Sequence, residues 1–201
     1  VTSLYKAGVP KTGWATILTG VSALGKTDPH IASAKQSGDA TGTVSADDAK
    51  WFASRGPGDL VAKVKVPTLI VQGMVDTLFT LQEGVTNYET VNRNGVPVAM
   101  VWFCGGHGLC NAAQGDPQRV SNDVAAWLDT YVKGNQNAPA VPGFDMTDQT
   151  GTRHTAKKWP LDQGAPFTAD GSGTLELSEV SRSGGPVSAA TKDDVVGRLS
   201  E

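Results

Sequence analysis

Two short apolar runs organise the chain, and each ends in a glycine-containing turn: VPTLIVQGMVDTLF at residues 66–79 and VPVAMVWFCGGHGLCN at residues 96–111. Continuous apolar runs of this length are typical of strands that are covered on both faces of a parallel sheet. We therefore predict strands at Thr68–Gln72 and Val98–Phe103. Asp76 follows the first strand and His107 follows the second, so a carboxylate and an imidazole are expected at the ends of neighbouring strands.

The residues after each strand have helical spacing. The first predicted helix begins at a possible capping box of Thr80 and Glu83 and ends at Asn94-Gly95, and its apolar face carries Leu81, Val85, Tyr88 and Val91. The second begins at Asp116-Pro117, and its inward face is expected to carry Val120, Val124, Trp127, Leu128 and Tyr131. Strand, helix and strand in succession imply parallel pairing with a right-handed crossover, and sites in such sheets form at the carboxyl ends of the strands.

Asp76 and His107 have the chemistry of two members of a hydrolytic triad. A histidine can take a proton from a hydroxyl nucleophile and return it, while a carboxylate on its other ring nitrogen fixes the tautomer. In α/β-hydrolases the members follow the order Ser, Asp or Glu, His, and one β-α-β unit separates Asp76 from His107 here. The alternative is that the Asp only forms a turn and the His is a bystander. His30 and His154 are expected to be surface residues.

The nucleophile is not evident. The nearest match to G-x-S-x-G is Gly20-Val21-Ser22-Ala23-Leu24, which lacks the second Gly and lies in a helical pattern rather than after a strand. The other serines before Asp76 fit no better: Ser3, Ser33, Ser37, Ser45 and Ser54. We therefore expect the serine and the first strands of the sheet in a segment upstream of Val1, and we interpret the chain as a fragment.

The segments on either side of the central part differ from it. Residues 1–60 are predicted to be helices and loops, with helical spacing after Trp14, a helix start at Asp28-Pro29, a loop at Ser37–Thr43 and a helix capped by Ser45. This arrangement suits a cap over a pocket. Residues 61–137 form the α/β part. Residues 138–201 are expected to begin a second, β-rich domain, with candidate strands at Phe144–Thr147, Arg153–Ala156 and Thr174–Leu177.

Cys104 and Cys110 bracket His107 in the sequence CGGHGLC. A disulfide would close a small loop around the histidine and place the protein in a secreted or cell-surface setting. Two other interpretations remain: a C-x-x-H-x-x-C metal site, which has three ligands and no obvious fourth, and two buried free thiols. We favour the disulfide and predict no metal.

Composition excludes several classes of function. The formal charge of −3 over 201 residues gives no basic footprint for nucleic acid. No apolar run approaches the ~20 residues of a membrane span. No motif indicates a cofactor.

At the residues quoted above the chain resembles the X-prolyl dipeptidyl peptidase and cocaine esterase group of α/β-hydrolase serine enzymes. The motifs that carry the resemblance are VPTLIVQGMVDTLF, NGVPV and WFCGGHG, and the match is specific over about residues 45–135. The resemblance implies Asp76 as the triad acid and His107 as the base. It also implies a helical cap at residues 1–60 and a jelly-roll β-sandwich after the catalytic domain.

The expected function is cleavage of a small peptide, amide or ester substrate by acyl transfer in the full-length enzyme, with this chain inactive alone. The expected partner is the N-terminal part of the same enzyme, as one polypeptide or as a separate piece of a split enzyme. The alternative is a hydrolase-like binding module without catalysis. Because an isolated half-sheet would expose an edge, we expect stability only with the missing half or as an oligomer.

Overall fold

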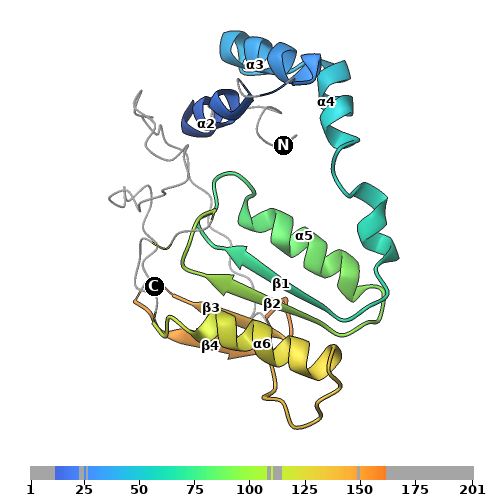
Figure 1. Ribbon diagram of the computed structural model, residues 1–201, viewed down its shortest axis with the longest axis vertical. Coiled ribbons are helices and arrows are strands. Elements are labelled where there is room, and N and C mark those ends of the chain that lie inside the picture. Colours follow the sequence, from blue (N-terminus) through green and yellow to red (C-terminus); the bar gives the residue numbers. More distant parts are fainter. Residues whose placement is uncertain are drawn as a thin grey trace, which may run out of the picture.

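The computed structural model describes residues 12–22, 25, 27–107, 110, 115–148 and 150–161. They form an α/β structure in which a four-stranded mixed sheet lies between two helices, and a group of helices from the N-terminal part of the chain stands at one end of it (Figure 1). The elements, in chain order, are α2 (Thr12–Ser22), α3 (Pro29–Thr41), α4 (Ala46–Ala53), the 3-10 helix η1 (Gly58–Lys63), β1 (Thr68–Gly73), α5 (Leu81–Asn92), β2 (Val98–Phe103), α6 (Arg119–Tyr131), β3 (Phe144–Thr147) and β4 (Arg153–Ala156).

The sheet has the strand order β1-β2-β3-β4. β1 and β2 pair in parallel, in a register that runs from Thr68 opposite Val98 to Gly73 opposite Phe103. The predicted strands and their parallel pairing are therefore confirmed. Because the two strands end side by side, the turns that follow them start at the same edge of the sheet.

β3 and β4 extend this sheet instead of starting a second one. β3 pairs in parallel with β2, and β4 pairs antiparallel with β3. The two strands form at the predicted residues, but their assignment to a separate β-rich domain is corrected by this pairing. The third candidate strand, Thr174–Leu177, and the rest of residues 162–201 lie outside the described residues, as does any β-sandwich there.

The core lies between the sheet and α5. It is built from Val85 and Tyr88 of α5, Met100 of β2 and Phe144 of β3, with Trp102 and other partly buried residues packed around them. The predicted inner face of α5 is thus confirmed at Val85, Tyr88 and Val91, which are all buried. Thr80 is the N-cap residue, although its side chain makes no capping hydrogen bond.

α6 covers the opposite face of the sheet. Successive residues of a strand point to opposite faces, so Asp145 faces α6 while its neighbour Phe144 faces α5. Trp127 of α6 is buried as predicted, but Leu128 and Tyr131 are exposed at 48% and 43%. These two residues were predicted to face inward, but the face that α6 buries is the one that carries Arg119, Asp123, Ala126 and Trp127.

Capping residues mark the starts of α3 and α4. Asp28 caps α3 with its carboxylate on the His30 N–H, Pro29 occupies the first turn, and Ser45 caps α4 through the Asp48 N–H at 3.0 Å. The loop expected at Ser37–Thr43 is wrong: α3 continues to Thr41 and ends at Gly42, whose φ of 69° forms a left-handed C-cap bonded to Gly38. None of the described helices is long and apolar enough to cross a membrane.

Candidate active site

The turns after β1 and β2 are joined along their backbones. The Met74 N–H donates to the Phe103 carbonyl at 2.9 Å, and the Val75 N–H donates to the Gly105 carbonyl at 3.2 Å. These bonds continue the parallel pairing past the last strand residues. They bring the side chains of Asp76 and His107 together, with the His107 Nδ1 atom 3.1 Å from the Asp76 Oδ2 atom.

The Asp76 carboxylate is held by its own turn. Its Oδ1 atom accepts hydrogen bonds from the backbone N–H groups of Leu78 at 2.8 Å and Phe79 at 2.9 Å. Only 6% of the side chain is exposed. With one oxygen occupied by the backbone, the other oxygen is directed at His107, so the acid is oriented before any substrate binds.

The His107 ring is held through its Nδ1 atom by the hydrogen bond to Asp76. A carboxylate only accepts hydrogen bonds, so an ionised Asp76 requires the proton on Nδ1 and leaves Nε2 of the neutral ring as an acceptor. The ring contacts Trp14 edge to face, with centroids 5.5 Å apart, and Phe79 at 5.3 Å. The side chain is still 45% exposed, so a reactant can reach it.

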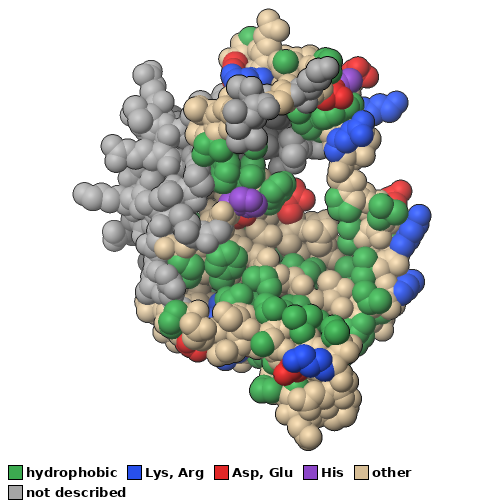
Figure 2. Space-filling view, viewed as in Figure 1, with side chains coloured by type: hydrophobic (Ala, Val, Ile, Leu, Met, Phe, Trp, Pro, Cys, Tyr) green, Lys and Arg blue, Asp and Glu red, His purple; other side chains and the backbone are tan. Residues whose placement is uncertain are grey.

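A pocket of about 310 Å³ lies beside this pair. Its lining residues are Val71, Gln72, Gly73, Asp76, Phe79, Phe103, Gly106 and His107. Figure 2 shows the hollow between the N-terminal helices and the sheet, with a histidine and hydrophobic side chains at its border. A mostly apolar wall with one acid–base pair is the usual composition of a small-molecule site.

Gly73 is a site residue that sequence reasoning missed. A Cβ atom built on it would lie 2.4 Å from the Gly105 carbonyl oxygen and 2.5 Å from the Gly106 carbonyl oxygen. The loop that carries His107 therefore crosses directly over the last residue of β1, and only glycine leaves room for it. The signal in the sequence is a glycine at the end of an apolar strand, three residues before the acid.

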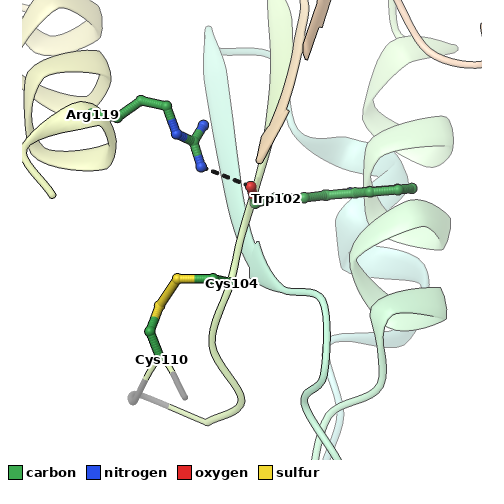
Figure 3. Close-up of a disulfide and its surroundings, with 4 residues drawn as sticks. All are labelled: Trp102, Cys104, Cys110 and Arg119. Carbon is green, nitrogen blue, oxygen red and sulfur yellow. Dashed lines mark hydrogen bonds between the residues drawn. A yellow bond between two sulfur atoms is a disulfide. The ribbon is translucent and has the colours of Figure 1, made fainter. Parts of the chain in front are cut away.

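The structure joins Cys104 and Cys110 by a disulfide, as predicted, and Gly105 forms an isolated bridge with Cys110. Figure 3 shows the bond at the end of β2, below Trp102. Both sulfurs are used in it, so they cannot act as metal ligands, and no group of three ligating side chains occurs among the described residues. Closing so short a loop constrains the unfolded chain by about 2 kcal/mol in the chain-entropy model. The disulfide closes the loop that carries His107.

Four charged residues fasten β2 and β3 to α6. Arg119 donates to Asp145 at 2.7 Å and to the Trp102 carbonyl at 2.8 Å, close to the start of the disulfide loop (Figure 3). Arg153 pairs with the same Asp145 and reaches Asp123 at 3.4 Å. Burial raises the pKa of Asp123 to about 6, and the neighbouring Asp145 carboxylate adds to the effect. This cluster anchors the strand from which the His107 loop departs.

The other two histidines also have aspartate partners. His30 lies 2.7 Å from Asp28, which raises the pKa of the imidazole, and it stacks on Trp51. His154 lies 2.9 Å from Asp148, whose pKa is lowered by hydrogen bonds from Thr150 and His154. Both pairs are local in sequence and on the surface. A His–Asp contact alone therefore does not single out a catalytic pair in this chain.

The sequence matches no family model, and no curated protein is significantly similar to it. The fold defines the class, an α/β protein with a mixed sheet of four described strands.

Proposed function

We propose that this chain carries the acid and the base of a serine hydrolase of the α/β-hydrolase type. The observation that supports the proposal best is the hydrogen bond between Asp76 and His107 at the ends of adjacent parallel strands, beside a pocket. The order Asp before His along the chain agrees with that class of enzyme. Asp76 also differs from the aspartates of the other two pairs in being buried.

In the proposed reaction a serine of the full-length enzyme attacks the carbonyl carbon of the substrate. The serine proton passes to Nε2 of His107, and the Asp76 carboxylate stabilises the imidazolium through Nδ1. When the tetrahedral intermediate collapses, His107 gives this proton to the leaving amine or alcohol, and the acyl group stays on the serine. Water then takes the place of the leaving group, with His107 again as base, and releases the acid and free serine.

The substrate class is a peptide, an amide or an ester, all of which react through the same tetrahedral intermediate. The helices before β1 act as a cap in this proposal, and a β-sandwich follows the catalytic domain. The disulfide supports an extracellular setting for the enzyme, because such bonds persist in oxidising compartments.

The test is labelling of the full-length protein by a fluorophosphonate probe, which reacts with an activated serine. We expect His107→Ala to slow labelling by about 100-fold or more, because a general base contributes a factor of that size. His154→Ala is the matched control, since it removes another histidine that pairs with an aspartate. Undiminished labelling of His107→Ala, or an equal loss in the control, would overturn the assignment.

A further inference from the structure

Trp14 connects the N-terminal helices to the candidate site. Its indole N–H donates to the Thr77 hydroxyl at 2.9 Å, although 63 residues separate the two in sequence. Thr77 directly follows Asp76. The hydrogen bond therefore ties α2 to the turn that presents the acid.

The same side chain also packs on the base. The Trp14 and His107 rings meet at an interplanar angle of 87°, which is the edge-to-face geometry that aromatic rings favour. The hydrogen bond from Nδ1 to Asp76 holds one atom of the imidazole and does not by itself fix the tilt of the ring. Contacts with Trp14 and Phe79 restrict that tilt.

Trp14 is distinct from an ordinary core residue of its helix. It is 6% exposed, whereas Ile17, one turn further along α2, is 42% exposed. It also lies outside the core cluster formed by α5 and the sheet. Its hydrogen bond to Thr77 and its ring contact with His107 both lie at the candidate site.

We propose that Trp14 is a positioning residue that fixes the orientation of His107 and ties α2 to the turn that presents Asp76. This inference rests on the proposed function, because it assigns Trp14 to the geometry of the same acid–base pair. The N-terminal helices then contribute to the geometry of the acid–base pair through Trp14. Their attachment sets how well the imidazole is aligned with the acid.

The test is NMR of the His107 side chain in the full-length protein. In the wild-type protein we expect a slowly exchanging Nδ1–H signal from the hydrogen bond to Asp76. Trp14→Ala should broaden or abolish this signal, since the ring gains freedom to tilt. Trp14→Phe keeps a ring without the N–H, and Thr77→Val keeps the indole without its acceptor, so both should weaken the signal less.

Trp51→Ala is the matched control, because Trp51 belongs to the same group of helices but stacks on His30. In the full-length enzyme Trp14→Phe should slow fluorophosphonate labelling by roughly 10- to 100-fold, as small misplacements of reacting groups do. A wild-type-like His107 signal in folded Trp14→Ala and Trp14→Phe would overturn the proposal. If His107→Ala does not affect labelling, the proposed function fails, while the NMR result still decides whether Trp14 orients the ring.

Discussion

Three histidines of this chain each contact an aspartate, and the differences between the three pairs lie in their surroundings. The Asp76 side chain is 6% exposed, whereas those of Asp28 and Asp148 are 41% and 24% exposed. Asp76 and His107 lie in the turns after two different strands and are 31 residues apart, while the residues of the other two pairs are two and six residues apart. A carboxylate that is buried and hydrogen-bonded by its own backbone keeps its direction, which is what orienting a base requires.

The close approach at Gly73 gives a prediction at the scale of one residue. Gly73→Ala should push the Gly105–Gly106 backbone away from β1, because two carbonyl oxygens lie where the new methyl group would be. We expect the Asp76–His107 hydrogen bond to break and the free energy of unfolding to fall by about 1–3 kcal/mol, as overpacking usually costs. Chemical denaturation and the His107 Nδ1–H signal measure the two effects.

Gly20→Ala serves as the control for that substitution. Gly20 lies inside α2, and a Cβ atom there would meet nothing within 4 Å. Alanine is favoured over glycine in a helix, so this variant should be at least as stable as the wild type. A Gly73→Ala protein with both wild-type stability and an intact Nδ1–H signal would show that the loop can move aside without loss.

At the scale of secondary-structure elements, a charged cluster fixes α6 against the sheet. Asp145 is fully buried and pairs with Arg119 from α6 and Arg153 from β4. Arg119 also bonds the Trp102 carbonyl, so the cluster reaches the strand that leads to His107. Leaving a buried charge of this kind without its partner is costly, so each residue of the cluster depends on the others for its pairing.

Asp123 makes this cluster sensitive to pH. Its pKa in the folded protein, about 6, lies above its ordinary value near 3.8, so folding favours the protonated form. The resulting stabilisation is complete below about pH 4 and is lost as the pH rises through 6. Asp123→Asn does not titrate, and its free energy of unfolding relative to the wild type should therefore rise by about 1–3 kcal/mol between pH 4 and pH 7.

Urea unfolding at several pH values measures this difference. Asp129→Asn is the control on the same helix, because Asp129 pairs with Lys133, whose side chain is 72% exposed. That variant should follow the wild-type pH profile closely. A pH-independent difference between Asp123→Asn and the wild type would contradict the assignment of the raised pKa to Asp123.

At the scale of the whole molecule, β1 is an edge strand of the described sheet. It pairs only with β2 among the described strands, and Val71 on it is 38% exposed. Apolar side chains of α6 are exposed as well, with Val132 just after the helix at 75%. An open strand edge next to apolar surface is a template for association with another strand.

We therefore expect this chain by itself to associate at micromolar concentration. Sedimentation velocity should show dimers or larger species that increase with concentration. Val71→Lys should reduce this association, because a charge on an edge strand opposes pairing. Asn87→Lys, at an exposed position of α5, is the control and should leave the association unchanged. A wild-type chain that stays monomeric and melts cooperatively would contradict the expectation.

The sequence predicted local structure well where the pattern was strong. The strands at Thr68–Gly73 and Val98–Phe103 and the buried face of α5 follow from apolar periodicity, which the chain carries within each element. The loop expected at Ser37–Thr43 failed because small polar residues say little about helix ends, and the cap at Gly42 decided the boundary. β3 and β4 were found as strands, but which sheet they join depends on pairing across the fold.

The sequence by itself determined that Asp76 and His107 come at strand ends and that Cys104 and Cys110 flank the histidine, since these are matters of order and spacing. Only the tertiary structure decided that the two side chains meet at 3.1 Å, that the His107 loop crosses close over Gly73, and that Trp14 contacts the imidazole. The physical reason is that these contacts join residues about 30 to more than 90 positions apart. Such contacts arise from the packing of elements against one another, and no local pattern in the chain encodes them.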